Sequence, residues 1–371
     1  MTDILAGPPP ARATAVPAAA LWFAAAFLLG GLALLGDVLP SAVSYPDALV
    51  IPFKDWIGAA MAWLRLNFMA VTRTVTAILD VPLQLSFALL AKGWKIGAGE
   101  NAILLPRLSW LGVCVVMGTL GYIYGGRGLA LLCGLGFLAL ALFGLWDQSM
   151  LTLALIVICV PFCVGTGLLA GIWGYRSPRA AKLLIGPALD LMQTMPTFAY
   201  LIPMLILFGN SPVSAMLATG LFATPPMVRA TMLGLHKVPQ EVEDFADMAG
   251  CTRRQKLWRV LVPAAKPSLM IGVNQVIMLA LNMVIISSMI GAGGLGYDVL
   301  LALRALKVGQ ALEAGLAIVI LAIVLDRLSQ AIARKRPEAV AAKGDNWLGR
   351  NVNLAAALAV LAVTTVLSIA V

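Results

Sequence analysis

The sequence predicts an all-α fold, a polytopic bundle of transmembrane helices. Of its 371 residues, 61% are hydrophobic and only 12% are charged, whereas about a quarter of the residues in a soluble domain are charged. Several apolar segments reach or approach the roughly 20 residues that cross the hydrocarbon core of a bilayer. Residues 128–146, GLALLCGLGFLALALFGLW, are apolar on every side, although a helix of a soluble protein keeps a polar stripe. These three observations argue against a soluble helical bundle.

The apolar segments predict about eight or nine spans. Two short segments, 108–124 and 213–228, are expected to be tilted, kinked or buried in protein. The first apolar run follows a single basic residue, Arg12, and lacks a clear small-x-small cleavage site, so we interpret it as a retained span and not as a signal peptide. The predicted spans are residues 17–36, 108–124, 128–146, 150–173, 183–209, 213–228, 268–290, 311–326 and 353–371.

Basic residues predict the orientation of these spans, because Lys and Arg are enriched in cytoplasmic loops. Alternating spans through three basic clusters places residues 147–149, 210–212 and 291–310 outside. The N-terminus then lies inside, and the segment 37–107 lies outside. The three clusters are Arg176, Arg179 and Lys182; Arg229, Lys237, Arg253, Arg254, Lys256, Arg259 and Lys266; and Arg327, Arg334, Lys335, Arg336, Lys343 and Arg350.

Part of the outer segment has an amphipathic pattern. Residues 47–68, DALVIPFKDWIGAAMAWLRLNF, alternate apolar and charged residues at helical spacing. This pattern predicts a helix that lies on the membrane surface or packs on the bundle.

Other sequence motifs do not indicate catalysis or cofactor binding by this chain. GAGGLG at 291–296 matches the dinucleotide fingerprint, but it follows a membrane segment and not a strand, so we interpret it as a flexible turn. No G-x-x-x-x-G-K-[ST] motif is present, and the single histidine, His236, cannot form a metal site or a triad alone. The basic residues are spread over loops and do not indicate nucleic-acid binding. The five cysteines, Cys114, Cys133, Cys159, Cys163 and Cys251, are interpreted as packing residues with no metal-ligand spacing.

Two glycine pairs predict close helix packing. Gly167 with Gly171, and Gly121 with Gly125, have the small-xxx-small spacing that lets helix backbones approach. This signal is structural and fits many functions.

A polar insert, VPQEVEDFADMAGCTRRQKLWRVLVPAAKP, interrupts the apolar pattern at 238–267. Pro239 can open a helix whose first turn is acidic, and Gly250 can end it with a left-handed cap. Thr252 can cap a second, basic helix that ends near Pro263. The insert therefore predicts a helix–glycine–helix unit on the cytoplasmic side. The exposed apolar face of Phe245, Met248 and Ala249 suits docking in a groove.

The insert resembles the EAA loop of ABC importer permeases. It reads Asp244-Phe245-Ala246-x-x-x-Gly250, then nine residues, then Val260-x-Val262-Pro263; the family pattern is Glu-Ala-Ala-x-x-x-Gly, nine residues, Ile-x-Leu-Pro. Longer flanks are similar to the glycine betaine/proline betaine permease branch over about 150–335. They include LDLMQTMPTFAYLIPMLILFG, FATPPMVRATMLGLHKVP, GVNQVIMLALNMVIISSMIGAGGLG and GLAIVILAIVLDRLSQ.

This resemblance implies a type I importer permease of the bacterial inner membrane. Its partners would be cytoplasmic ABC ATPase subunits, a periplasmic solute-binding protein and a second permease copy in a homodimer. ATP and Mg would bind the ATPase, and this chain would hold no cofactor, no metal and no catalytic residue. The ATPase-coupling residues would be Asp244, Phe245, Ala246, Gly250, Arg253, Arg254 and Pro263.

Polar residues inside the apolar segments predict the translocation path, because such groups tend to face the bundle or a water-filled route. Asn and Gln also form bonds between helices, so a packing role stays open for each of them. Asp190 and Asn274 are further polar candidates. The predicted path residues are Gln193, Thr194, Pro196, Tyr200, Gln275, Met278 and Asn282.

The sequence divides into three predicted regions. Residues 1–107 hold the first span and the amphipathic outer segment, 108–335 form the permease core with the coupling helix near 239–263, and 336–371 form a basic linker and an extra span. The apolar end of the chain suggests that this protein, or its relatives, continues into a second permease copy.

The predicted cargo is a quaternary amine or betaine-type osmolyte, such as glycine betaine, proline betaine, choline or trimethylamine N-oxide. The alternatives are a permease for another small solute such as an amino acid, an ion-coupled secondary transporter, and a structural scaffold.

Overall fold

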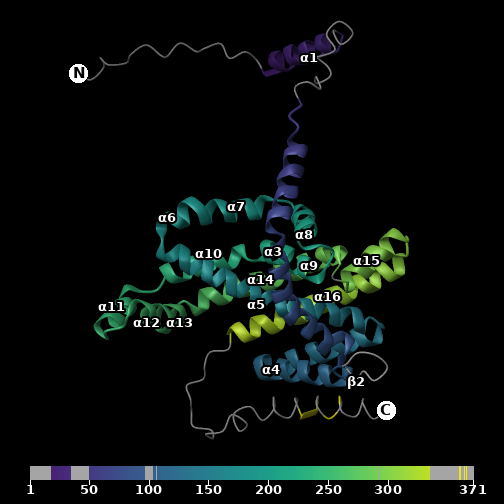
Figure 1. The fold of residues 1–371 in the computed structure, drawn as a ribbon, viewed down its shortest axis with the longest axis vertical. Helices are drawn as coiled ribbons and strands as arrows, with labels where there is room; N and C mark the ends of the chain where they lie inside the picture. The colour runs from purple at the N-terminus through teal and green to yellow at the C-terminus, as the bar shows by residue number, and fades with distance from the viewer. Residues whose placement is uncertain are drawn as a thin grey trace, which may run out of the picture. The chain divides into compact units, whose positions relative to one another are not determined.

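The computed structural model describes residues 18–34, 50–96, 103–105, 107–291, 293–334, 359–360, 363 and 365. The chain divides into two units, Met1–Ala62 and Trp63–Val371. The described residues are helical apart from turns and one short ladder, in which β1 (Trp94–Ile96) pairs antiparallel with β2 (Ile103–Leu105). The predicted all-α class is therefore confirmed (Figure 1).

The first unit holds α1 (Ala18–Leu34), which coincides with the first predicted span. The helix has 17 residues, and its apolar centre is Trp22–Gly31. At 1.5 Å per residue, it is about 26 Å long, slightly shorter than the hydrocarbon core.

The helix predicted at 47–68 is present from Phe53 onward, but it is the start of a longer apolar helix for which the sequence predicted no span. α3 (Phe53–Phe87) continues into the π-helical turn η3 (Ala88–Lys92), and Phe53–Lys92 is long and apolar enough to cross a membrane. Asp80 and Gln84 interrupt its apolar pattern, so no span was predicted there. In the structure Gln84 donates to the Asp80 carboxylate at 3.1 Å, one turn away, and this bond gives each polar group a partner within the helix.

α4 (Trp110–Leu142) is a helical hairpin. Gly126 leaves the helical conformation with φ 73° and ψ −163°, a region that is open to glycine. The two arms then lie against each other: a Cβ added at Gly121 would be 2.7 Å from the Leu129 carbonyl oxygen. The arms correspond to the two predicted segments 108–124 and 128–146.

The core of the second unit is built around α5 (Trp146–Arg176), α10 (Pro225–His236) and α14 (Lys266–Ser287). α10 packs on α5 and α14, while α9 (Pro212–Ala223) packs on α5 and α14. α16 (Val308–Arg334) packs on α4, α14 and α15 (Leu295–Arg304). The predicted spans 150–173, 268–290 and 311–326 are confirmed as Trp146–Arg176, Lys266–Ile290 and Val308–Ile332.

The predicted single span 183–209 is wrong, because the helix is broken. Pro178–Thr194, which comprises α6 (Pro178–Ala180), η4 (Ala181–Ile185) and α7 (Gly186–Thr194), meets Thr197–Phe208 at a bend of 115°. Met195 is extended, as expected of a residue that precedes a proline. Thr197–Phe208 comprises the 3₁₀ turn η5 (Thr197–Tyr200) and α8 (Leu201–Phe208).

The predicted span 213–228 is also divided between two helices. α9 ends at Ala223, and α10 begins at Pro225, so the Pro225-Pro226 pair restarts the helix at its first turn. The predicted count of eight or nine spans is not confirmed: within the described residues, five helices are long and apolar enough, or six with the bent pair. The predicted span 353–371 and the linker before it lie outside the described residues, apart from 359–360, 363 and 365.

The predicted inner and outer loops gather at opposite ends of the second unit. At one end the Leu295 N–H donates to Thr152 Oγ1 at 3.0 Å, and Gly291 lies against Asn210. At the other end Tyr175, at the end of α5, stacks edge-on with His236, at the end of α10. Figure 1 shows α15 and α11 (Gln240–Met248) at these two ends. This separation agrees with the alternation that the basic clusters predicted.

Glycines bring α5 and α10 into close contact. A Cβ added at Gly171 would lie 2.5 Å from Thr231 Cβ and 2.9 Å from the Val228 carbonyl oxygen, and one added at Gly167 would lie 2.7 Å from Met227 Cβ. The close packing predicted from this glycine pair is confirmed.

We predict that Gly171→Ala destabilises the protein by about 1–3 kcal/mol, because the α5 and α10 backbones must separate. The thermal unfolding midpoint of the purified chain in one detergent should fall. Gly165→Ala on the same helix is the matched control, since nothing lies within 4 Å of its added Cβ. Equal midpoints for the two variants would contradict the close contact.

Candidate coupling surface and translocation path

α11 begins where the sequence predicted a cytoplasmic helix. Pro239 occupies the N-cap position, and Glu241 and Glu243 lie in the first turn. Their negative charges face the positive end of the helix dipole, which stabilises the start of a short helix. The sequence predicted that Pro239 lies in the first turn. In the structure Pro239 is the N-cap, and the helix begins one residue later, at Gln240.

α11 ends in a Schellman motif. Gly250 has φ 70°, the Cys251 N–H donates to the Ala246 carbonyl at 3.1 Å, and the Gly250 N–H donates to the Asp247 carbonyl at 3.0 Å. These two bonds satisfy carbonyl groups that a helix end leaves free. The predicted left-handed cap at Gly250 is confirmed.

A second helical run follows without a loop. Thr252 accepts from the Gln255 N–H while Gln255 accepts from the Thr252 N–H, which is the capping box that starts a helix. The run comprises α12 (Arg253–Gln255), the π-helical η6 (Lys256–Leu261) and α13 (Val262–Ala264). Arg253, Arg254 and Pro263 are exposed. Leu257 and Leu261 are buried, so the run is anchored on its apolar side.

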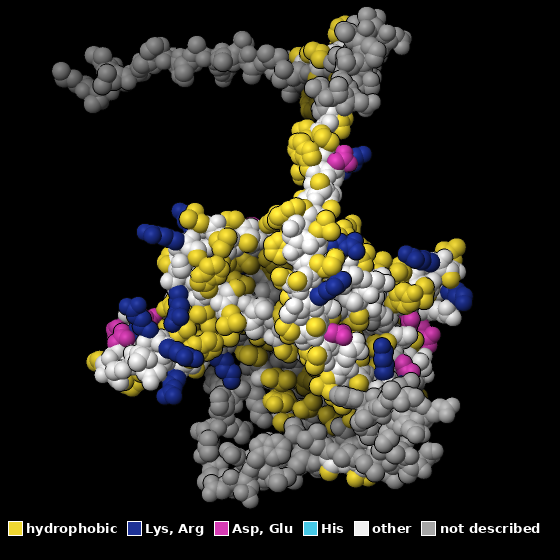
Figure 2. Space-filling model, in the orientation of Figure 1, with side chains coloured by type: hydrophobic (Ala, Val, Ile, Leu, Met, Phe, Trp, Pro, Cys, Tyr) yellow, Lys and Arg dark blue, Asp and Glu magenta, His cyan; other side chains and the backbone are white. Residues whose placement is uncertain are grey.

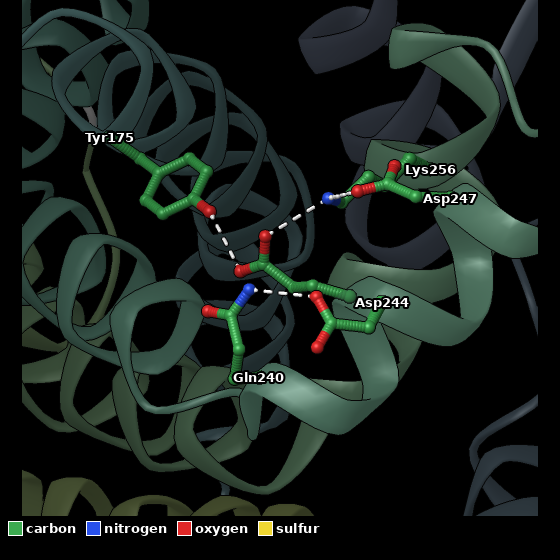
Figure 3. Close-up of polar contacts among 6 residues, drawn as sticks. Tyr175, Gln240, Asp244, Asp247 and Lys256 are labelled. Atoms are coloured by element: carbon green, nitrogen blue, oxygen red, sulfur yellow. Dashed lines mark hydrogen bonds and ion pairs between the residues drawn. The ribbon is translucent and has the colours of Figure 1, made fainter.

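One lysine ties α11 to this second run. Lys256 Nζ lies 2.9 Å from Asp247 Oδ2 and 3.1 Å from Glu243 Oε2, and Tyr175 donates to Glu243 Oε1 at 3.4 Å. Figure 3 shows these groups converging from α5, α11 and η6, with Gln240 bonded to Asp244 beside them. The Lys256 ammonium donates hydrogen bonds to the Asp247 and Glu243 carboxylates, and these bonds raise the pKa of Lys256.

The two sides of α11 differ sharply in exposure. Ala246 is 1% exposed and faces the rest of the unit, whereas Phe245 is 66% and Met248 is 82% exposed. Ala249 and Asp244 are also exposed. Figure 2 shows basic side chains grouped over the end where α11 to α13 lie. The exposed apolar face with a charged rim is present, and the caps and Lys256 hold α11 to the neighbouring helices; its docking role stays a prediction.

Some predicted path residues lie at the break of the bent span. Gln193, Thr194 and Pro196 are exposed, whereas Tyr200 is buried and its hydroxyl donates to the Met192 carbonyl across the break. Tyr200 also packs in a cluster with Met283 of α14. Tyr200 thus closes the bend against α14, and its ring is not part of the exposed surface.

The other predicted path residues lie on α14. Gln275, Met278 and Asn282 are all exposed and, with Ile271, form one stripe along the helix. Asn274 takes the packing role that the sequence left open, since it accepts from Ser329 Oγ of α16 at 2.6 Å. Among the described residues, the structure records no side-chain hydrogen bond for Gln275 or Asn282. These two amides therefore face away from their own bundle.

One charged pair was not predicted from the sequence. Arg229, assigned there to a cytoplasmic loop, lies inside α10, and its Nη2 is 2.6 Å from Asp190 Oδ1 of α7. Both charged residues were visible in the sequence, Asp190 inside one predicted span and Arg229 directly after another. Their pairing was not, because it depends on how the broken span folds back on α10.

The fold defines a class: a polytopic helical membrane protein in which an exposed, capped helix lies between apolar segments. A protein-family model described as binding-protein-dependent transport system inner membrane component matches residues 164–336. The chain is 39% identical over 285 residues to the glycine betaine/proline betaine transport system permease protein ProW of Escherichia coli K12, covering 77% of this chain and 76% of that protein. It is 40% identical over 286 residues to the glycine betaine transport system permease protein OpuAB of Bacillus subtilis 168, covering 77% and 96%.

The chain belongs to this family of inner membrane components of binding-protein-dependent transport systems. It is a multi-pass protein of the bacterial inner membrane and a transport permease subunit. It is also 38% identical over 298 residues to the trimethylamine N-oxide transport system permease protein TmoV of Ruegeria pomeroyi, and it spans 44% of the length of that protein. Inward-facing structures of the MetNI methionine ABC transporter share 19% identity over 52% of this chain, with a TM-score of 0.45.

We predict that Lys256→Gln loosens α11, because Asp247 and Glu243 lose their common cation. Amide hydrogen exchange of residues 240–250 in the detergent-solubilised protein should become several-fold faster. Lys237→Gln is the control, since Lys237 is exposed at the end of α10. Unchanged exchange after Lys256→Gln would show that the caps alone hold the helix.

Proposed function

We propose that this chain is the transmembrane subunit of an ATP-driven importer for a quaternary amine or betaine-type osmolyte. The observation that carries the proposal is the exposed, capped helix α11 in a chain that shares 38–44% identity with permeases named for such solutes. Those names include glycine betaine, proline betaine and trimethylamine N-oxide, and a relative at 42% identity is named for glycine betaine and carnitine. These solutes share a small methylated nitrogen that carries positive charge, usually balanced by a nearby oxygen anion.

The energy would come from a separate subunit. The sequence contains no P-loop motif, so ATP and Mg would bind the partner ATPase, and this chain would catalyse no reaction. Phe245 and Met248 would enter a cleft of the ATPase, as an amphipathic helix enters a groove. Closure of the ATPase would then pull on α11, and Lys256 and Tyr175 would pass the movement to η6 and α5.

A solute-binding protein would deliver cargo at the opposite end, where Thr152, Gly294 and Asn210 lie. A second copy of this chain would complete the path. Amide groups facing lipid are costly, and Gln275 and Asn282 are exposed on α14 without a partner from the described part of their own bundle. A homodimer that buries this stripe would line a polar path with residues from both copies.

Uptake into proteoliposomes tests the function. We predict that the chain, reconstituted with its ATPase and binding protein, takes up radiolabelled glycine betaine only when ATP is supplied. Phe245→Ser combined with Met248→Ser should reduce uptake at least about tenfold, because a docking helix without apolar anchors loses roughly 2 kcal/mol or more of binding.

The conservative variant Phe245→Leu keeps an apolar anchor and should retain most of the uptake. ATP-independent uptake by the chain alone would indicate an ion-coupled transporter. Full uptake by the double Ser variant would remove the docking role of α11.

Disulfide cross-linking tests the second copy. We predict that Met278→Cys, in membranes treated with a mild oxidant, gives a dimer band that the wild-type chain lacks. Val319→Cys is the control, because Val319 is exposed on α16 away from the stripe. Equal cross-linking of both variants would reflect random collision and would contradict a specific α14 interface.

A further inference from the structure

The pair Asp190–Arg229 joins two helices that carry the exposed polar surface of the second unit. Arg229 Nη2 lies 2.6 Å from Asp190 Oδ1, yet the two side chains are 52% and 69% exposed. The two charged groups are therefore close enough for a hydrogen-bonded ion pair, and both side chains remain accessible to a solute.

Both charges lie within helices. Arg229 is seven residues before His236, the last residue of α10, which places it about 10 Å along the helix from the cytoplasmic end. Asp190 lies in α7, within the bent segment Pro178–Phe208 that has the apolar character of a span. Charged groups at such positions face a bundle interior or a water-filled cavity and not lipid.

The face of α7 around Asp190 is polar. Asp190, Gln193 and Thr194 have the spacing i, i+3 and i+4, so they share one side of the helix, and all three are exposed. On an adjacent side, Ile185 and Leu189 pack against Val228 of α10, and Asp190 pairs with Arg229 of α10. α7 is thus held on α10 by an apolar contact and by the ion pair, and Gln193 and Thr194 next to the pair are exposed.

We propose that Asp190 and Arg229 form a solute subsite in the translocation path, in which Asp190 takes the quaternary ammonium and Arg229 takes the oxygen anion. This inference rests on the proposed function. A zwitterion carries one charge of each sign. When it binds, two ion pairs between protein and solute replace the Asp190–Arg229 pair, and no charge is left unpaired. That exchange avoids the cost of an uncompensated charge away from bulk water. Because the pair re-forms when the solute leaves, binding is weak, as transit requires.

A solute subsite and a purely structural ion pair predict different effects of mutation on the uptake of different cargoes. A structural pair would affect every cargo equally, because its loss would only weaken the packing of α7 on α10. A subsite with separate charges discriminates by cargo charge. Asp190→Asn leaves a cationic site that repels choline but still attracts the carboxylate of glycine betaine. Arg229→Gln leaves an anionic site with the opposite preference.

The test compares the two solutes in the same proteoliposomes, which contain the permease, its ATPase and its binding protein. Relative to wild type, Asp190→Asn should lower choline uptake about threefold to tenfold more than glycine betaine uptake, a difference of up to one decade. Arg229→Gln should lower glycine betaine uptake more than choline uptake by a similar factor. Because the binding protein is unchanged, its own preference cancels in each ratio.

The control is the ion pair Arg107–Asp147 at the start of α5, which is also exposed. Arg107→Gln and Asp147→Asn should change uptake of the two solutes by the same factor. A second measurement is saturation-transfer NMR of each solute with the permease–ATPase complex, without binding protein. It detects binding and therefore does not require that both solutes are transported. Wild type should give methyl signals for both solutes, Asp190→Asn should lose the choline signal, and Arg229→Gln should lose the glycine betaine signal.

The outcomes separate this inference from the proposed function. Parallel losses for both solutes in both variants, or NMR signals that do not change, would overturn the subsite and leave the importer standing. No uptake of either solute by the wild-type complex would overturn the importer and the subsite together.

Discussion

The contact between α5 and α10 is the constraint on which the second unit depends. Gly167 and Gly171 let α10 approach so closely that side chains and backbone of α10 occupy the space of their missing Cβ atoms. In a bilayer, lipid tails are as apolar as the helices, so such close van der Waals packing supplies much of the association energy. The buried cluster around Cys163, Ile172, Met227 and Leu235 extends this contact over most of α10.

α10 thereby connects the two surfaces for which functions are proposed. Its far end carries His236 against Tyr175, and four residues later the chain enters α11. Two turns inside the same helix, Arg229 reaches Asp190 on the broken span. In the proposed mechanism, α10 is packed on the glycines of α5 and joined to α11 by a short turn, so it would carry a displacement of α11 to Arg229.

The sequence was informative where local chemistry decides the structure. The helix–glycine–helix insert, its Gly250 cap and its Thr252 cap follow from residue types within one turn, and the apolar runs of α5, α14 and α16 follow from composition. The sequence did not predict the features that tertiary contacts determine. The polar residues Asp80 and Gln84 concealed the span in α3, because their mutual bond is not visible in the sequence. Pro196 broke a segment that composition alone presented as continuous. The partner of Arg229 could not be predicted either, because Asp190 is 39 residues away across a helix that folds back on α10.

The turn at Gly126 has a consequence for the surrounding lipid. Each arm of α4 has about 16 residues and so extends roughly 24 Å, whereas the hydrocarbon core of a bilayer is about 30 Å thick. Arg127 directly follows the turn and is exposed, so its guanidinium needs water or headgroups nearby. A hairpin shorter than the hydrocarbon core is accommodated by local thinning of the bilayer or by flanking side chains that extend to the interface, so acyl-chain length acts directly on this part of the protein.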